Sequence, residues 1–204
     1  MVNISPILKS IVSKSKGRPI FVIGKGPSLD AIDCSALPDG LIFNLNDSER
    51  VIPGDVGIFS ANWVRHSLQE HGFRCGHYLA AKPLPDSVPH DLLPPIPIDL
   101  DNEDLKTLRL EKDTFYDESF VLLNAVKLAL LCHVECDEVL DVYFLGFDFS
   151  TRSASQSSKA GQDWSGADAR ERDAIISAQE AEFKQFIHHF SKGDRLRLHH
   201  IGEK

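Results

Sequence analysis

The sequence is poor in the features that mark zinc-binding and disulfide-stabilised proteins. It has four cysteines in 204 residues, and Cys132 and Cys136 form the one closely spaced pair. No second Cys/His pair with zinc-ligand spacing accompanies them. Because they lie at the end of an apolar segment, we interpret them as buried thiols and expect no metal. Their pattern indicates a reducing compartment.

Long apolar runs are missing as well. No stretch approaches the roughly 20 residues of a membrane-spanning helix. Residues 1–16 contain basic side chains but no continuous apolar core of a signal peptide. We expect a cytoplasmic protein with no membrane span, and peripheral contact with the inner membrane stays open. Because the chain stops directly after a strand pattern, we expect residues 1–204 to be one domain from a longer polypeptide.

Positive charge is scarce. The chain has 22 Lys and Arg against 30 Asp and Glu, which gives a formal net charge of −8. A protein with this balance has no bulk attraction for nucleic acid or an anionic membrane. A phosphate-bearing ligand would therefore need local positive potential from a helix dipole or from single basic side chains.

The chain does contain alternating strand and helix patterns. Largely apolar segments predict strands at 19–23, 41–44, 55–59, 77–81, 138–145 and 195–201, and the first of them is a continuous apolar run with β-branched residues. Apolar residues at helical spacing predict helices at 4–15, 63–71, 119–133 and 168–190. This alternation predicts an α/β, Rossmann-like domain with a mostly parallel sheet and helices on both faces.

Two segments lack either pattern. Residues 82–100 contain six prolines, which exclude a helix and a central strand and predict an extended surface connection. Residues 151–164 are rich in Ser, Lys, Gln and Gly, which predicts a mobile loop that could serve as a lid.

The first candidate site is the glycine-rich loop after the first strand. Gly24 and Gly26 permit a tight turn that aims backbone amides at a ligand. Lys25 adds a cation, and Ser28 can cap the following turn or contact a phosphate. The loop lacks the third glycine of a dinucleotide fingerprint and the Gly-Lys-Ser/Thr of a Walker loop. We predict a nucleotide-like ligand; the alternative is a tight turn without one.

The second candidate site follows the second and third strands. Asn44, Asn46 and Asn62 offer paired donors and acceptors suited to a ribose or a base edge. Ligands of open α/β sheets bind at the carboxyl ends of strands, where these residues are expected. Asparagine is also a common turn and cap residue, so both interpretations stay open.

The third candidate site follows the strand at 138–145. Gly146 permits a sharp turn, and Asp148 is expected to emerge at the same sheet edge as the glycine loop. Its carboxylate could bind a sugar hydroxyl, act as a base or hold a metal that bridges phosphates. The alternative is a turn or helix cap.

These three segments, in this order, resemble the bacterial sialyltransferases that use a CMP-activated sugar. The match consists of the Gly-Lys-Gly-Pro-Ser-Leu sequence at 24–29 with Ile32-Asp33, Ser35 and Leu37-Pro38, then Phe43-Asn44, and then 119–131 and 139–149. Archaeal hydroxymethylpterin pyrophosphokinase-like proteins and flagellin glycan-transfer accessory proteins share the Gly-x-Gly-Pro-Ser-Leu and Gly-x-Asp segments.

The resemblance implies a role for each matched residue. Phosphate and cytidine would face Gly24, Lys25 and Gly26, with Ser28 and Gly146 in the same nucleotide site. Asn44 and Asn62 would contact the nucleotide, Ser119 the cytidine side, and Asp148 the sugar or ribose. The implied partners are a nucleotide sugar and a glycan acceptor in bacterial surface-polysaccharide synthesis, with no separate cofactor. A homo-oligomer and a fused catalytic domain are both compatible with it.

The departures from the family concern catalysis. Lys25 replaces an asparagine, Phe120 a glycine and Ser150 a tyrosine, and residues 163–168 lack the family's catalytic histidine. A base is still needed to deprotonate the acceptor, and Asp163 or Asp168 could serve. The alternatives are a sugar-nucleotide-binding module without catalysis and a magnesium-dependent pyrophosphokinase-like phosphotransferase.

Overall fold

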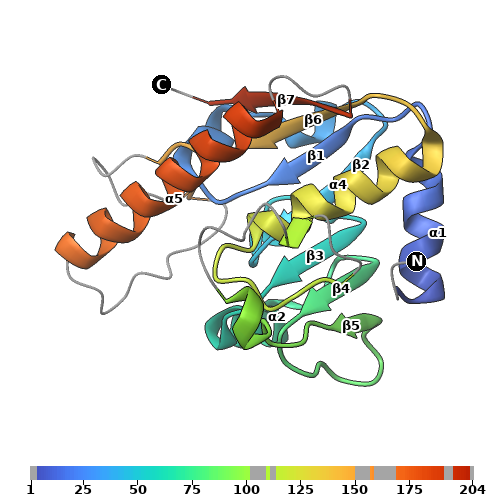
Figure 1. Cartoon of the computed structure of the whole chain (residues 1–204). Helices are drawn as coiled ribbons and strands as arrows, with labels where there is room; N and C mark the ends of the chain where they lie inside the picture. The colour runs from blue at the N-terminus through green and yellow to red at the C-terminus, as the bar shows by residue number, and fades with distance from the viewer. Residues whose placement is uncertain are drawn as a thin grey trace.

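The fold is built on one seven-stranded sheet. The computed structural model describes residues 4–101, 109–110, 114–149, 157–158, 169–190 and 195–202. The strands run in the order β5-β4-β3-β2-β1-β6-β7, and every neighbouring pair is parallel (Figure 1). They are β1 (Ile20–Ile23), β2 (Leu41–Leu45), β3 (Val56–Phe59), β4 (His77–Ala80), β5 (His90–Leu92), β6 (Leu140–Leu145) and β7 (Leu196–Ile201). The prediction of a Rossmann-like α/β domain is confirmed.

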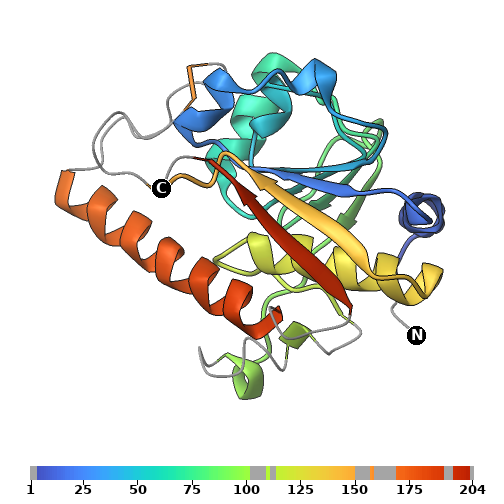
Figure 2. The same cartoon turned by 90° about the horizontal axis from the view of Figure 1, so that it is seen from above.

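Helices cover both faces of the sheet, as Figure 2 shows from above. The layer on one face comprises α1 (Pro6–Val12), α4 (Leu122–Cys136) and α5 (Ala169–Phe190). The opposite face carries α2 (Asn62–His71) and the 3-10 turns η2 (Pro27–Ala31) and η3 (Cys34–Ala36). No helix in these described ranges is long and apolar enough to cross a membrane.

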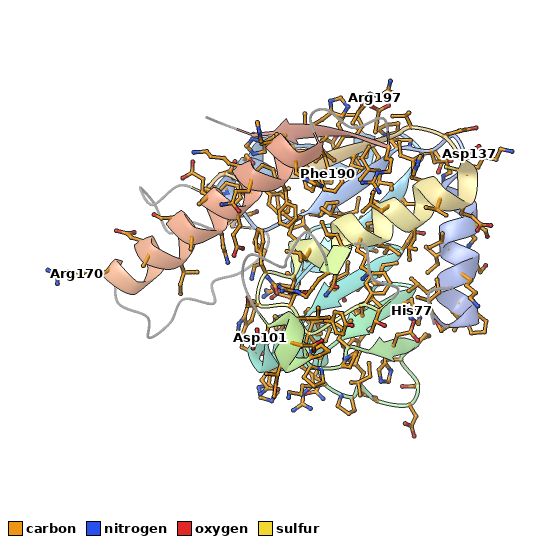
Figure 3. The ribbon with its side chains drawn as sticks, viewed as in Figure 1. His77, Asp101, Asp137, Arg170, Phe190 and Arg197 are labelled. Carbon is orange, nitrogen blue, oxygen red and sulfur yellow. The ribbon has the colours of Figure 1, made fainter. Side chains whose placement is uncertain are left out.

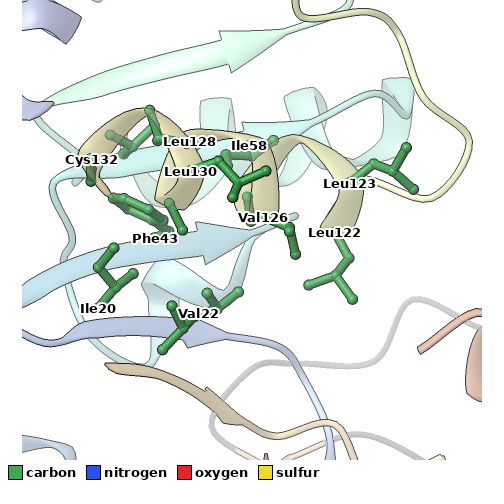
Figure 4. Packing of buried hydrophobic residues seen from close by; sticks show 14 of the residues in the cluster. Ile20, Val22, Phe43, Ile58, Leu122, Leu123, Val126, Leu128, Leu130 and Cys132 are labelled. Atoms are coloured by element: carbon green, nitrogen blue, oxygen red, sulfur yellow. The ribbon is translucent and has the colours of Figure 1, made fainter. Parts of the chain in front are cut away.

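The core explains why the strands are continuous apolar runs. Ile20 and Val22 of β1 pack into the layer that holds α4, whereas Phe21 and Ile23 pack against the turns on the other face. Figure 4 shows α4 lying over β1 and β2, with Ile20, Val22 and Phe43 of these strands directed toward the helix. Both faces of the central strands are therefore withdrawn from water, so neither face carries a polar stripe.

The proline-rich segment holds a strand that the sequence did not predict. β5 is a three-residue strand whose only pairing is with β4, at the edge of the sheet. Prolines are tolerated there because an edge strand does not need all of its amide donors. The exclusion of a central strand from residues 82–100 agrees with the structure.

The glycine loop leads into a 3-10 turn rather than an α-helix. η2 contains five residues, and a turn of this length sums few peptide dipoles. A helix dipole therefore contributes little positive potential beside the loop, and the basic side chain of Lys25 becomes the main candidate.

Helix α5 extends beyond the sheet. Its carboxyl half packs on the core through Phe183, Phe186 and Phe190, while its amino half runs past the arrowheads of the strands (Figure 1). Arg170, in the first turn, points into solvent (Figure 3). The amino half of α5 can therefore form a wall at the carboxyl ends of the strands.

Candidate functional site

A cavity of about 390 Å³ opens at the carboxyl ends of the strands. It lies where the strand order reverses, because the chain continues from β1 to β2 on one side and later adds β6 on the other. Open α/β sheets bind ligands at this position, and the volume suits a small molecule. The lining comprises Gly24, Lys25, Gly26, Leu45, Asn46, Ser60, Ala61, Trp63, Ser119, Phe120, Val121, Gly146, Phe147, Asp148, Phe149, Ile175, Ile176 and Gln179.

The loops after β1 and β6 are packed directly on each other. The amide of Gly24 donates to the carbonyl of Leu145 at 2.8 Å, and the amide of Gly26 donates to the carbonyl of Gly146 at 2.7 Å. A Cβ atom at Gly24 would lie 2.5 Å from the Gly146 carbonyl oxygen. These glycines thus allow two backbones to touch, and their amides are not aimed at the cavity as the sequence led us to expect.

Asp148 completes the junction between the two loops. Its Oδ2 atom accepts a hydrogen bond from the Ser28 amide at 2.8 Å. Its Oδ1 atom and the Ser28 hydroxyl are both buried without a hydrogen-bond partner in the described part of the chain. The glycine loop and Asp148 therefore share one end of the sheet, as predicted. Ser28 itself lies outside the cavity lining and acts here through its backbone.

Lys25 supplies the cation at the cavity. Its Nζ atom lies 2.6 Å from Oδ1 of Asp47, which is fully buried after β2, and 4.9 Å from the centre of the Trp63 ring. Asp47 also accepts the hydroxyl of Ser67 at 2.7 Å, and Arg50 lies 3.8 Å away. Burial lowers the pKa of the Lys25 ammonium, and the Asp47 carboxylate opposes that effect. Lys25 and Arg50 together exceed the charge of Asp47 by one, and the Asp148 carboxylate in the cavity lining offsets that surplus.

Asn44 takes a supporting position. It is fully buried, its Nδ2 donates to the carbonyl of Ile52 at 3.2 Å, and its Oδ1 accepts the Ser48 hydroxyl at 3.0 Å. The same hydroxyl lies 2.8 Å from the carbonyl oxygen of Ile23, the residue before the glycine loop. Asn44 does not line the cavity. In this structure it fixes the end of β2 against the end of β1.

The other predicted polar residues separate into three groups. Asn46 lines the cavity in a left-handed conformation with φ of 57°, and Ser119 lines the opposite wall. Asn62 is exposed at the start of α2 and does not line the cavity. Asp163 and Asp168 lie outside the described residues, so their predicted role as a base stays a prediction.

An aromatic wall closes the cavity toward α5. Phe147 stacks on Phe183 with ring centres 5.5 Å apart, and Phe120 lies 6.3 Å from Phe186. Phe149 adopts φ of 48°, which keeps its ring beside Phe147. Phe120 also contributes to the cavity lining.

The described part of the predicted lid is attached to the glycine loop. The amide of Ser157 donates to the carbonyl of Lys25 at 2.7 Å, and its hydroxyl lies 2.6 Å from Oδ1 of Asp30. The amide of Ser158 donates to the other oxygen of Asp30 at 3.1 Å. These two residues therefore anchor the segment at the cavity, and its role as a lid stays a prediction.

A buried ion pair supports the wall that contains Ser119. Arg109 bonds both carboxylate oxygens of Glu118, at 2.7 and 2.8 Å, and both side chains are almost fully buried. The ammonium of Lys127 donates to the carbonyl of Arg109 at 2.9 Å. The Ser60 hydroxyl lies 3.1 Å from the carbonyl oxygen of Glu118 and joins this wall to the end of β3.

Within the described ranges, no three His, Cys, Asp or Glu side chains come together in a way that could hold a metal ion. Cys132 is buried inside α4, and Cys136 lies near the carbonyl oxygens of His133 and Glu138. Burial raises the pKa of the Cys132 thiol to about 12. This thiol is therefore protonated at neutral pH.

Sequence reasoning missed several residues of this site, among them one aromatic and one acidic side chain. Trp63 and Asp47 were not predicted to contribute, yet Asp47 fixes Lys25 and Trp63 lines the cavity. Both directly follow strands, as Asn46 and Asn62 do, and this position was the available signal. The pairing of Lys25 with Asp47 depends on the register of β1 beside β2, which no local pattern encodes.

The fold and the cavity define an all-parallel α/β domain with a ligand-sized site at its switch point. No protein-family model matches the sequence, and no curated protein matches it closely. The chain is similar to solved structures of the sialyltransferase CstII, including the Campylobacter jejuni enzyme with cytidine-5'-monophosphate (15% identity, TM-score 0.43). A complex with a trisaccharide acceptor and CMP matches at 14% identity and TM-score 0.42, and one with CMP-3FNeuAc at 13% and 0.40. These matches cover 89–91% of this chain and 80% of the others, and they assign no residue of the site.

Proposed function

We propose that this domain binds a CMP-activated sialic acid, or a related acidic sugar, in the cavity and transfers the sugar to a glycan acceptor. The observation that carries the proposal is the cavity at the β1–β6 switch point, whose described lining includes one cation, Lys25, and one carboxylate, Asp148. The motif resemblance supports the proposal, because it implies nucleotide contacts from the same loops.

The charge of the site favours a ligand with one phosphate. Lys25 is the one cation in the described lining and Asp148 the one carboxylate, so the positive potential of the site is limited and confined to the side of Lys25. A nucleoside monophosphate ester fits this charge better than a diphosphate or triphosphate, which usually bring a bound cation. We therefore propose that the donor needs no metal, and that magnesium belongs only to the phosphotransferase alternative.

In the proposed reaction, the bond between the anomeric carbon and the phosphate oxygen breaks, and CMP leaves with that oxygen. The acceptor hydroxyl oxygen forms the new bond to the anomeric carbon and gives its proton to a base. Lys25 would stabilise the charge that develops on the leaving phosphate. Asp163 and Asp168 are the candidate bases, because they lie in the segment that lacks the family's histidine and a carboxylate can accept this proton.

A second candidate function is nucleotide-sugar binding without turnover. It is favoured by the position of Asp148, whose Oδ2 already holds the Ser28 amide and thus joins two loops. A carboxylate used in this way is suited to shaping a site rather than to moving a proton. In that case the domain would bind the donor for a catalytic domain elsewhere in a larger protein.

Calorimetric titration with CMP, CDP, UDP, ATP and a pterin, each with and without magnesium, tests the proposal. Metal-independent binding of CMP is expected, and a bound ligand should also raise the melting temperature. An ATP response that requires magnesium would support a pyrophosphokinase-like activity instead. CMP release from CMP-sialic acid in the presence of glycan acceptors then separates transfer from binding alone. A chain that binds none of these ligands would contradict both candidates.

A further inference from the structure

Trp63 is the most exposed aromatic side chain in the described lining of the cavity. Its exposed fraction is 40%, whereas those of Phe120 and Phe147 are 8% and 7%, and Phe149 is half-buried. The three phenylalanines pack on other rings of the core, including Phe183. The indole is therefore the aromatic surface best placed to receive a planar ligand group.

Contacts with neighbouring side chains hold this indole in position. The Nζ atom of Lys25 lies 4.9 Å from the ring centre, and the same atom pairs with the buried Asp47 at 2.6 Å. Asp47 in turn accepts the Ser67 hydroxyl at 2.7 Å. Trp63 and Ser67 are four residues apart on α2 and so lie on one face of that helix.

Helix α2 is itself held in place by the core. Val64 and Leu68 are fully buried against the β3 and β4 side of the sheet, where they pack with Phe59 and Tyr78. The ring thus belongs to a rigid element, and its cation partner is held by a buried carboxylate. Because the indole is already held in place, it loses little conformational entropy when a ligand stacks on it.

We propose that Trp63 is the stacking surface for the nucleobase of the bound nucleotide. The inference rests on the proposed function, and it adds the residue that holds the base. The base would cover the part of the indole that faces the cavity, beside Lys25, and the phosphate would lie toward the loop that carries Lys25. A purine or pyrimidine ring fits this surface because every base has a π-face.

A stacking role also predicts that Trp63 does not discriminate between nucleobases. A ring face distinguishes bases weakly, because base identity is read through hydrogen bonds to base edges. Trp63 should therefore contribute to the affinity for CMP and UMP equally. The choice between them falls to polar groups of the lining, such as Asn46 and Ser60.

Fluorescence provides a direct test. The chain has two tryptophans, Trp63 and Trp164, so replacing Trp164 leaves Trp63 as the single tryptophan that emits. In a Trp164→Phe background, titration with CMP should quench the emission of Trp63 with the same dissociation constant that calorimetry gives. Trp63→Ala should weaken the binding of CMP and UMP by about 10-fold or more, and equally for both. Trp63→Phe, which keeps a smaller ring, should lose less. Gln69→Ala, at an exposed position on the same helix, is the matched control and should bind like the wild type.

The outcomes separate the two proposals. If wild-type protein binds CMP while Trp63→Ala keeps the same affinity and Trp63 is not quenched, stacking is ruled out and the proposed function stands. If calorimetry detects no CMP binding to wild-type protein, both are overturned. If Trp63→Ala does not fold, as its melting curve would reveal, Trp63→Phe and the quenching titration decide the question.

Discussion

Oδ2 of Asp148 accepts the backbone amide of Ser28 at 2.8 Å, so the loops after β6 and β1 are joined at the point where the strand order reverses. The two residues are 120 positions apart in the chain. The same side chain lines the cavity, and therefore the shape of the site and the packing of the two loops depend on one carboxylate.

Removal of this carboxylate should affect both stability and binding. In Asp148→Ala the Ser28 amide loses its acceptor, which should lower the free energy of unfolding by about 1–3 kcal/mol. Asp148→Asn keeps an oxygen but loses the charge and should cost less. Urea denaturation measures the first effect, and CMP calorimetry is expected to show weaker binding. Asp39→Ala removes an 85% exposed carboxylate and is the control; an equal loss there would contradict the prediction.

Gly26→Ala tests whether the glycine loop needs its glycines for packing. An added Cβ would clash with the Asp148 carboxylate and lie 2.7 Å from the Gly146 carbonyl oxygen. The loops would have to separate, which should cost about 1–3 kcal/mol of stability and weaken CMP binding. In Gly76→Ala the nearest atom to the new Cβ is the Asp55 carbonyl oxygen at 3.3 Å, so this variant should cost less stability than Gly26→Ala and leave CMP binding unchanged in the same assays.

The contribution of Lys25 to stability can be separated from its contribution to CMP binding with variants of Lys25 and Asp47. Lys25→Met leaves the buried Asp47 without its closest cation, and breaking such a pair costs about 3–5 kcal/mol. Adding Asp47→Asn removes the uncompensated charge and should recover much of that loss. CMP affinity should stay low in the double variant, because the cation for the phosphate is still missing. Recovery of CMP binding together with stability would show that Lys25 is structural only.

Much of the fold could be predicted because the strands are buried on both faces. Continuous apolar runs such as residues 19–23 are local signals, and parallel order follows from the alternation with helices. β5 was not predicted because its three residues, at the edge of the sheet, do not form an apolar run. Helix ends shifted for a related reason: α4 begins at Leu122, where packing on the sheet rather than the spacing of apolar residues sets the first turn.

The site was harder to predict than the fold. The sequence identified Gly24, Gly26 and Asp148, but the use of the glycine amides depends on contact with the loop after β6, which only the folded sheet creates. Asn44 shows the same limit. Its position at a strand end was correct, yet the burial of its side chain follows from the Ser48 and Ile52 contacts of a turn whose shape the sequence did not reveal.

The buried carboxylate of Glu49 gives the domain a pH-dependent stability. Tyr78 donates its hydroxyl to both oxygens of Glu49, at 2.8 and 2.9 Å, and the Arg74 amide donates at 2.8 Å. Burial nevertheless dominates and raises the pKa of Glu49 above its usual value of 4.5. The folded state therefore holds this proton to a higher pH than the unfolded state does.

The sign of the effect follows from that difference. As the pH rises above about 4.5, the unfolded chain releases the Glu49 proton first, so stability falls until the pH has passed the raised pKa of the folded state. Glu49→Gln cannot lose this proton. As the pH increases from 4.5 toward neutrality, Glu49→Gln should thus gain stability relative to the wild type, seen as a rising difference between their free energies of unfolding. Urea titrations at several pH values measure it, and Glu70→Gln, at an exposed position on α2, should instead run parallel to the wild type. A constant difference for Glu49→Gln would mean that its hydrogen bonds offset its burial, and a difference of the opposite slope would mean that they outweigh it.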